Sequence, residues 1–241
     1  MSRSDGRQDD EPRELKLTMG FIQTAKSSVL VECGRTRVIV TASVENRVPP
    51  FLVNTGRGWV SAEYAMLPGS TNTRKARDGR RAGHVDGRTI EIQRLIGRSL
   101  RSVVNMKNLG PRTIWIDCDV IEADGGTRTA SITGAWVVLS DILRQLQDEK
   151  IIKRSPLTGG VAAVSAGIVD GRPILDLCYE EDSSAEGDFN FVLSHEGGII
   201  EVQGCGEQRP IEKEHYEACF DLAEKGLKSI VATQQEALNG D

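Results

Sequence analysis

The segment YEEDSSAEGDFNF, residues 179–191, carries the side chains of this sequence that are best suited to metal chemistry. It holds five carboxylates, of which Asp182 and Asp188 flank the stretch SSAEG. If residues 174–179 and 189–193 pair as a hairpin, these two acids come close together. Side-by-side carboxylates repel, and a divalent cation between them keeps both ionised, which is a common way to hold Mg²⁺ near a phosphate. Taken alone, the segment fits a solvated acidic loop better than a metal site.

The motif DGGTR, residues 124–128, has the composition of an anion-binding turn. Its glycines leave a predicted strand and let the backbone approach a ligand, and Thr127 and Arg128 open a predicted helix whose first N–H groups and dipole favour an anion. Arg128 adds a guanidinium fork suited to phosphate, and Arg88, in the first turn of the preceding predicted helix, is a candidate second clamp. A turn followed by a helix N-cap explains GGTR on its own, and a surface ion pair explains Arg88.

The tract from Pro68 to His84 gathers positive charge in a chain whose net charge is −5. Its basic residues are Arg74, Lys75, Arg77, Arg80 and Arg81. The tract has no large apolar side chain to bury, so it is predicted to be a loop. Such a loop indicates salt-sensitive, sequence-independent binding to a phosphate backbone, whereas the absence of aromatic residues gives no support for base stacking. A merely solvated charged loop is the other interpretation.

Composition limits the classes of function. The chain has 241 residues, 39% hydrophobic and 27% charged, which is typical of a soluble globular protein with one large domain or two modest ones. No run approaches the roughly 18 apolar residues of a membrane span, and the N-terminus is too polar for a signal peptide, so we expect a cytoplasmic protein with no membrane partner. The five cysteines form no C-x-x-C pair and the three histidines lie far apart, which argues against a zinc site.

Hydrophobic patterning places the candidate residues at the ends of strands and helices. The predicted elements are a hairpin over residues 28–44, a strand near 58–62, a helix capped by Asp86, a strand over 113–121, a helix that runs to about Glu149, strands near 161–168, 174–179, 189–193 and 199–203, and a helix from Pro210 to Asn239. Strands followed by helices occur twice. We therefore predict an α+β fold, α/β-like in its alternation, of two similar units over residues 1–155 and 156–241.

A phosphate pocket, an acid pair and a polyanion-binding loop together suit a reaction on a nucleic-acid phosphodiester. The sequence also contains the segments RSDGRQDDEPRE, GWVSAEYAMLP, GRTIEIQRLIGRSLR, DCDVIEADGGTRTASITGA, LDLCYEEDSSAEGDFNFV and EVQGCGE. In these segments, and over nearly its whole length, it resembles the ribonuclease PH family. The resemblance implies a duplicated βαβα ribonuclease PH fold, with an N-terminal half like domain 2 of ribosomal protein S5 and a smaller C-terminal half.

The resemblance also implies a phosphorolytic 3′–5′ exoribonuclease. In that reaction inorganic phosphate is the co-substrate and attacks the terminal phosphodiester of RNA, which releases nucleoside diphosphates and trims the 3′ ends of tRNA precursors and of other structured RNA such as rRNA. The reverse reaction adds nucleotides to RNA 3′ ends, so the enzyme is also a tRNA nucleotidyltransferase. The implied cofactor is Mg²⁺, with Mn²⁺ as an alternative, and the implied assembly is a homohexamer built as a trimer of dimers.

Individual roles follow from the family's motifs. The phosphate-binding residues it implies are Arg88, Gly126, Thr127 and Arg128. The catalytic and metal-binding residues it implies are Asp182 and Asp188. The RNA-binding residues it implies are Arg74, Arg77, Arg80 and Arg81. The sequence departs from the family at Gly69, where an arginine that contacts RNA usually follows MLP, and at Cys205, which replaces a usual threonine.

Two other functions stay open. One is a catalytically silent, RNA-binding ring subunit of the exosome type; such members have lost the aspartate pair or the phosphate-site arginine, whereas this sequence keeps both. The other is a hydrolytic metal-dependent nuclease, in which activated water takes the place of phosphate. Whether phosphate is consumed separates the hydrolytic reaction from the phosphorolytic one.

Overall fold

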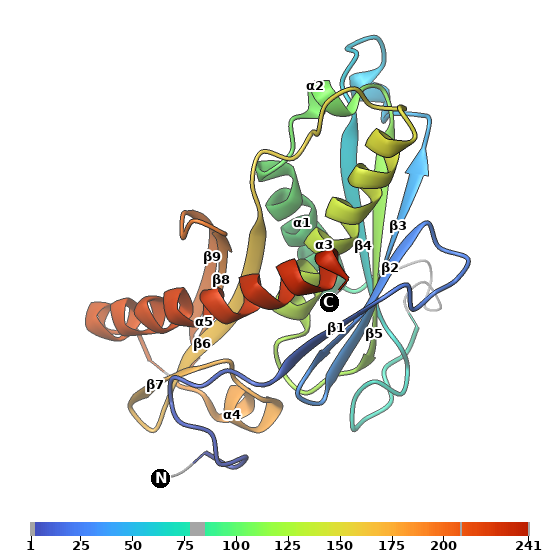
Figure 1. Cartoon of the computed structure of the whole chain (residues 1–241). Coiled ribbons are helices and arrows are strands. Elements are labelled where there is room, and N and C mark those ends of the chain that lie inside the picture. The colour runs from blue at the N-terminus through green and yellow to red at the C-terminus, as the bar shows by residue number, and fades with distance from the viewer. Residues whose placement is uncertain (1–2, 78–84, 208, 241) are drawn as a thin grey trace.

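The computed structural model describes residues 3–77, 85–207 and 209–240, which fold around two β-sheets (Figure 1). The first sheet has the order β1-β2-β3-β5-β4. Its strands are β1 (Leu15–Met19), β2 (Ser27–Cys33), β3 (Thr36–Glu45), β4 (Trp59–Met66) and β5 (Thr113–Glu122). The predicted hairpin around Gly34 is confirmed as β2 and β3, whereas β1 at the sheet edge and a short 3-10 helix, η1 (Pro50–Leu52), were not predicted.

The connection from β4 to β5 carries the first helices. These two strands run parallel, so the chain between them must cross over instead of turning back tightly. The crossover contains α1 (Gly87–Ser102) and the short α2 (Met106–Leu109). As predicted, Asp86 caps α1, because its carboxylate accepts a hydrogen bond from the backbone N–H of Arg88 at 3.4 Å.

The second sheet has the order β7-β6-β8-β9, and each strand in it is antiparallel to its neighbours. Its strands are β6 (Val161–Val169), β7 (Arg172–Leu175), β8 (Gly187–Ser194) and β9 (Ile199–Gly206). The helices that follow strands of this half are α4 (Tyr179–Ser184) and α5 (Lys213–Asn239). The predicted end of the last helix is confirmed, since Gly240 forms a left-handed C-cap with φ 79°, but the helix begins at Lys213 instead of Pro210.

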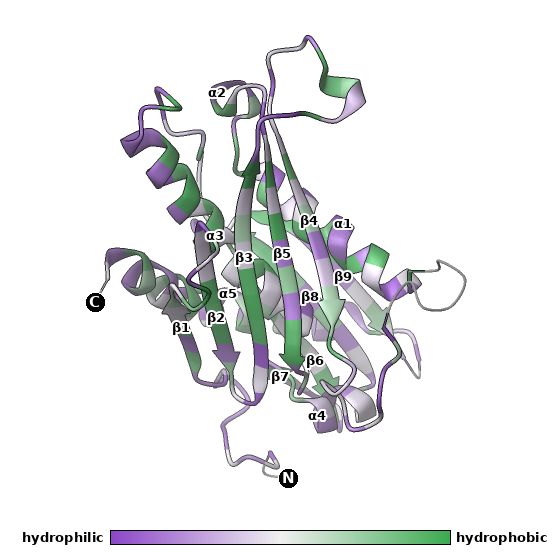
Figure 2. Ribbon diagram, turned by 90° about the vertical axis from the view of Figure 1, so that its right-hand side faces the viewer, coloured by the Kyte–Doolittle hydropathy of each residue, from purple (hydrophilic) through white to green (hydrophobic). Residues whose placement is uncertain are grey.

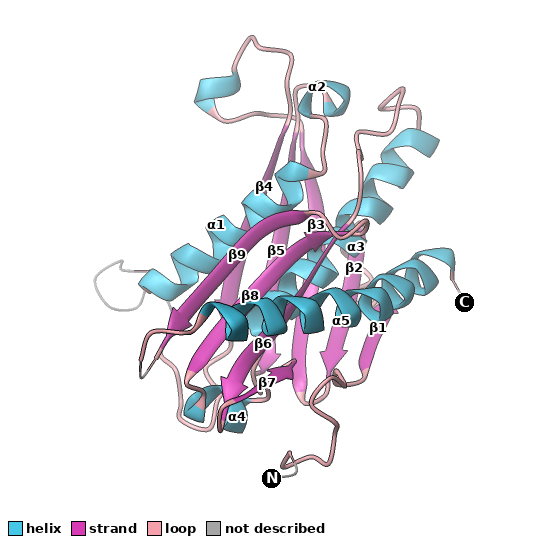
Figure 3. Cartoon of the chain, turned by 90° about the vertical axis from the view of Figure 1, so that its left-hand side faces the viewer, coloured by secondary structure: helices cyan, strands magenta, loops and turns pink. Residues whose placement is uncertain are grey.

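The helix α3 (Thr127–Asp148) joins the two halves. It contacts β2 and β3 of the first sheet and β6 of the second, and most of its side chains are buried. The helix α5 covers the other face of the second sheet and also reaches β1 and α3 (Figure 3). Hydrophobic residues are concentrated in the strands and inner helices, while the N-terminal segment is hydrophilic (Figure 2). Among the described helices, none combines the length and apolar character that crossing a membrane would need.

The predicted hairpin between residues 174–179 and 189–193 is wrong. The strand β7 ends at Leu175 and pairs with β6, which separates it from β8. Because β7 and β8 are both antiparallel to β6, they run parallel to each other and require a crossover. That crossover contains α4, whose start is closed by a capping box in which the Glu181 carboxylate accepts from the Cys178 backbone N–H at 3.0 Å. Asp182 therefore lies on a helix, not at a strand end.

Candidate active site

Predicted residues from both halves of the chain line one small cavity of about 50 Å³. Its lining residues are Arg88, Gly126, Thr127, Arg128, Ser165, Leu177, Asp182, Asp188 and Asn190. The cavity opens beside a larger one of about 840 Å³, which shares Arg88, Gly126, Thr127 and Asp182. Since roughly 10–15 Å³ of such space holds one water molecule, the small cavity has room for a small anion. Asp182 and Asp188 both line this cavity, so the two acids lie near each other as predicted. A crossover through α4 brings them together, however, and not the predicted hairpin.

The loop that precedes α3 is held in a conformation that glycine allows. Gly125 and Gly126 have φ values of 77° and 64°, in the left-handed region that other residues rarely adopt. A Cβ atom on Gly125 would lie 2.5 Å from the carbonyl oxygen of Leu177, so this loop touches the segment that leads into α4. The Thr36 hydroxyl fixes the loop from β3, accepting from the Asp124 N–H at 2.9 Å and donating to the Gly125 carbonyl at 2.6 Å.

The start of α3 is arranged for an anion. Its N-cap is Gly126, which has no side chain to cap the first N–H groups of the helix. The buried Thr127 hydroxyl makes a 2.9 Å hydrogen bond with the hydroxyl of Tyr64 on β4, and burial raises the pKa of Tyr64. Arg128 donates to Gln203 Oε1 on β9 at 2.7 Å and lies 3.6 Å from Glu91 of α1. Arg128 is therefore fixed between the two halves, with its charge at the cavity.

The acid pair lies opposite these cations. Asp182 comes from α4 and is accessible at the cavity, while Asp188 comes from β8, is partly buried and accepts from Asn190 Nδ2 at 3.1 Å. Burial raises the pKa of Asp188 to about 6, and the negative charge of Asp182 adds to that effect. Loss of hydration also raises the pKa of Asp182, against the opposing charges of Arg88 and Arg128. A positive charge bound between Asp182 and Asp188 would therefore favour the ionised form of both carboxyl groups.

A divalent cation fits this pair. In the described part of the chain no group of three or more His, Cys, Asp or Glu side chains converges as a metal site. Mg²⁺, however, usually keeps several waters and binds through one or two carboxylates together with substrate phosphates. Two carboxylates whose pKa values are raised by burial, next to a candidate phosphate site, match that donor set.

The described part of the predicted RNA-binding loop, which ends at residue 77, lies at the larger cavity. Lys75 lines that cavity and forms a 3.1 Å ion pair with Asp86, whereas Arg74 and Arg77 are exposed and are not among its lining residues. Arg80 and Arg81 lie outside the described residues. Cys205, which stands where the family usually has a threonine, is exposed on β9 and pairs with Asp188 of β8 in the strand ladder.

Sequence reasoning missed the partners that hold the site residues. Tyr64, Ser165, Asn190 and Gln203 come from four strands of both sheets and touch or line the site. Tyr64 and Gln203 belong to no local pattern, because each contacts a site residue that lies far away in the sequence. Asn190 alone had a local signal, because it stands two residues after Asp188 and so shares its side of β8.

Two family models match the chain: domain 1 of the 3′ exoribonuclease family over residues 11–144, and domain 2 of the same family over residues 159–226. The chain belongs to the ribonuclease PH family of 3′ exoribonucleases. The predicted α+β ribonuclease PH fold is likewise confirmed by the two sheets and the arrangement of the helices around them.

Three solved structures share this family's fold with the chain. Rice (Oryza sativa) Rrp46 has a TM-score of 0.77 at 17% identity, over 98% of this chain and 100% of that one. The Archaeoglobus fulgidus exosome with RNA bound to the active site has a TM-score of 0.79 at 19% identity, over 96% and 92%. An archaeal exosome core has a TM-score of 0.77 at 18% identity, over 98% and 92%. At these identities the likeness establishes the shared ribonuclease PH fold.

Proposed function

We propose that this chain is a phosphorolytic 3′–5′ exoribonuclease that trims the 3′ ends of tRNA precursors, and of other structured RNA such as rRNA, in the cytoplasm. The observation that carries the proposal is the small cavity in which Arg88, Arg128 and the start of α3 face Asp182 and Asp188. A hydrolase needs a bound water there, whereas two arginines beside a helix N-terminus form a dedicated site for an anion. Inorganic phosphate is the anion that the reaction would consume.

The proposed reaction needs positioning more than covalent chemistry from the protein. Arg88, Arg128 and the N–H groups at the start of α3 bind the attacking phosphate and orient one of its oxygens toward the terminal phosphodiester of the RNA. A bond forms between that oxygen and the RNA phosphorus, and the bond from phosphorus to the 3′-oxygen of the penultimate nucleotide breaks. The 3′-oxygen takes up the proton that the attacking hydrogen phosphate gives up, and a nucleoside diphosphate leaves. The reverse reaction extends RNA from nucleoside diphosphates.

Asp182 and Asp188 are proposed to hold Mg²⁺, or Mn²⁺ in its place. When bound there, the cation would neutralise charge on the phosphoryl oxygens. In this arrangement the aspartates fix the position of that positive charge, while the arginines fix the phosphate nucleophile. The proposal therefore gives the two kinds of residue separable roles.

The RNA is proposed to enter along the larger cavity. Lys75 lines it, and Arg74 and Arg77 lie exposed on the same loop, where they can contact the RNA backbone. The exosome neighbours add a second candidate, a catalytically silent ring subunit, because they are parts of exosome assemblies. Retention of both aspartates and both arginines in one cavity favours an active enzyme over that candidate.

The experiment that tests the proposal is shortening of a tRNA that carries a few extra 3′ nucleotides, in Mg²⁺, as a function of phosphate concentration. We expect shortening that rises with phosphate and saturates. The variant Asp188→Ala should lose turnover but bind the RNA as the wild type does, because the basic loop is untouched. Shortening that does not depend on phosphate would indicate a hydrolase, and no shortening at all would favour the silent subunit.

A further inference from the structure

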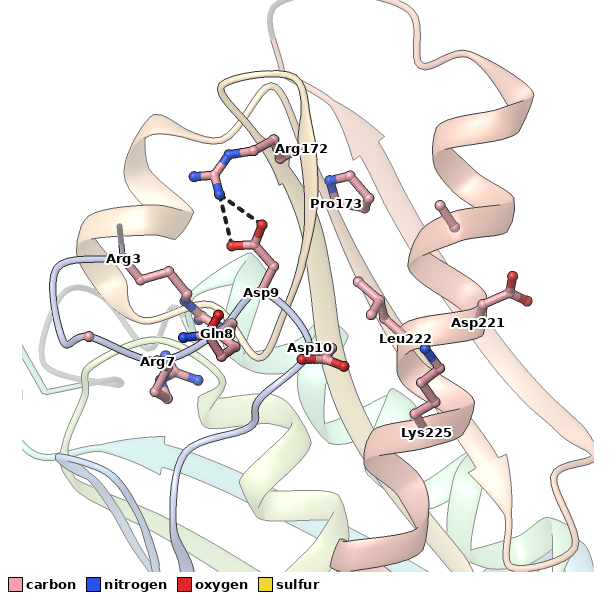
Figure 4. Close-up of a pocket in the computed structure, with 12 residues that line it drawn as sticks. Arg3, Arg7, Gln8, Asp9, Asp10, Arg172, Pro173, Asp221, Leu222 and Lys225 are labelled. Carbon is pink, nitrogen blue, oxygen red and sulfur yellow. Dashed lines mark hydrogen bonds and ion pairs between the residues drawn. The ribbon is translucent and has the colours of Figure 1, made fainter. Parts of the chain in front are cut away.

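The N-terminal segment, residues 3–13, lies against the second half of the chain, beside β7 and α4 (Figure 4). Arg3 donates to the Glu181 carboxylate through Nε and Nη2, at 2.7 and 2.8 Å, and both side chains are buried. Asp9 accepts from Arg172 of β7 at 2.7 and 2.9 Å in a more exposed ion pair. The segment is thus tied at one point to the capping residue of α4 and at another to β7.

Arg13, at the end of this segment, makes the most extensive of these contacts. Its Nε and Nη2 donate to the two carboxylate oxygens of Asp176, at 2.9 and 2.7 Å, and its backbone N–H donates to the same carboxylate at 2.8 Å. Its remaining arm, Nη1, donates to the carbonyl oxygen of Asp124 at 2.6 Å. Arg13 and Asp176 are both buried, at 8% and 4% exposure, so water does not compete for these bonds. We call these three residues the Arg13 clasp.

The surroundings of Arg13 leave it little room to move. A Cβ atom on Gly34 would lie 2.7 Å from Arg13 Cδ, and one on Gly126 would lie 2.8 Å from Arg13 Nη2. Both glycines have left-handed φ values, 55° and 64°, so the backbone on each side packs directly against the guanidinium and its stem. The slot is therefore shaped for this side chain in this orientation.

The two residues that Arg13 bonds, Asp124 and Asp176, each lie just before one part of the proposed active site. Asp124 is followed directly by Gly125, Gly126, Thr127 and Arg128, the anion loop. Asp176 precedes α4 by three residues and has a left-handed φ of 52°, and its carbonyl accepts from Arg3 and Arg7. The Asp124 carboxylate also accepts from the Tyr179 N–H, at the first residue of α4, at 3.3 Å. The anion loop and the helix that carries Asp182 thus meet at Arg13.

We propose that Arg13 is a positioning residue that sets the distance between the phosphate site and the aspartates across the two halves of the chain. The inference rests on the proposed function, since that distance matters only if phosphate and an aspartate-bound cation act on the same phosphodiester. Its two-sided geometry carries the proposal: one planar guanidinium bridges a carboxylate from one half and a carbonyl from the other. Arg13 lines the larger cavity but not the small one, in which phosphate and the aspartates are proposed to meet.

The test compares Arg13→Lys with Arg172→Gln. Lysine keeps the charge but is a single point donor, so it cannot hold the Asp176 carboxylate bidentately and reach Asp124 as well. We expect Arg13→Lys to lower kcat about 10- to 100-fold, as for a misplacement of about 1 Å, with the Kd for tRNA unchanged within about twofold. Arg172→Gln breaks an ion pair of the same N-terminal segment away from the site, and its kcat should stay within about twofold of the wild type.

A double variant, Arg13→Gln with Asp176→Asn, separates positioning from stability. It replaces the buried ion pair with a neutral, hydrogen-bonded pair, and asparagine tolerates the left-handed backbone at residue 176. We expect Tm to recover toward the wild-type value relative to Asp176→Asn alone, while kcat stays low. Recovery of kcat together with Tm in the double variant, or a wild-type kcat in Arg13→Lys, would overturn the proposal that Arg13 is a positioning residue. A wild type that makes no nucleoside diphosphate would instead overturn the proposed function.

Discussion

At the residue scale, Asp188 is a carboxyl group whose burial in the fold disfavours its ionised form. Its pKa of about 6 means that the folded protein binds this proton more tightly than the unfolded chain does. The free energy of unfolding therefore falls as pH rises from about 4 to about 6, and the ionised group destabilises the fold above that range. The ionised carboxylate thus lowers the stability of the fold, a cost that its proposed role as a metal ligand would explain.

We therefore expect Asp188→Asn to stabilise the metal-free protein at pH 8 by about 1–3 kcal/mol, since one pKa unit corresponds to about 1.4 kcal/mol. At pH 4 most of the gain should be lost, because Asp188 is then protonated in the folded state and about half protonated in the unfolded chain. Chemical denaturation in chelator at the two pH values measures this. A variant that is less stable than the wild type at pH 8 would show that Asp188 is structural.

The other residue-scale prediction concerns Arg128, which we assign to phosphate. Removal of a charged hydrogen-bond donor costs about 1.5–3 kcal/mol, so Arg128→Ala should raise the KM for phosphate about 10- to 100-fold while the Kd for tRNA stays the same. Arg98→Ala is the matched control, because this arginine lies on the exposed side of α1 and bonds Glu201 at 2.9 Å. An unchanged phosphate KM in Arg128→Ala would place the anion site elsewhere.

The sequence predicted the charged residues that line the small cavity but not the residues that hold them. Arg88, Arg128, Asp182 and Asp188 stand next to glycines, a cap or another acid, and such local patterns are visible without a structure. Their supports were not visible. Tyr64, Gln203 and Arg13 reach the site from parts of the chain that are distant in sequence, and only the pairing of strands and the packing of the two halves bring them there.

At the element scale, the anion loop before α3 depends on a backbone that only glycine fits. We expect Gly125→Ala to lower the free energy of unfolding by about 2–4 kcal/mol, because a methyl group would add a clash with Leu177 to the strain of a positive φ. Gly171→Ala, at φ 72° with open space around its Cβ, should cost only about 1–2 kcal/mol. Denaturation curves measure both. Equal losses would mean that the contact with Leu177 is not close.

Among the elements that the sequence failed to predict, α4 is the one that carries a candidate site residue. Its six residues, YEEDSS, show no apolar periodicity, and an acidic stretch between two β-rich runs resembles a hairpin loop. The deciding information is tertiary: β6 takes the place between β7 and β8, so the chain must cross over. By contrast, α1, α3 and the β2–β3 hairpin have caps, glycine turns and long periodic runs, and these local signals were sufficient to predict them.

At the scale of the whole molecule, the charge distribution leads to a prediction about assembly. The net charge is −5, yet the loop at the larger cavity is basic. In a homohexamer, built as a trimer of dimers, such loops would gather at one opening and concentrate positive potential where RNA enters. Sedimentation at physiological protein concentration should show a hexamer, and a monomer would remove this explanation of the acidic net charge.

The same loop should set the salt dependence of RNA binding. Removing one cation that neutralises a phosphate reduces the slope of log Kd against log salt by about 0.7 for single-stranded RNA, so replacing Arg74, Lys75 and Arg77 by glutamine should reduce it by about 2. Phosphate KM should not change, because these side chains do not line the small cavity. Binding titrations at several salt concentrations test this, and an unchanged slope would place the RNA path elsewhere.

We propose that phosphate, not water, is the nucleophile in the small cavity, which is lined by Arg88, Arg128, Asp182 and Asp188. The most direct measurement is the fate of isotopically labelled inorganic phosphate during digestion of a tRNA with extra 3′ nucleotides. We expect the label to appear in the β-phosphate of released nucleoside diphosphates, and Arg128→Ala to lower its incorporation at limiting phosphate. Release of unlabelled nucleoside monophosphates would contradict the proposal.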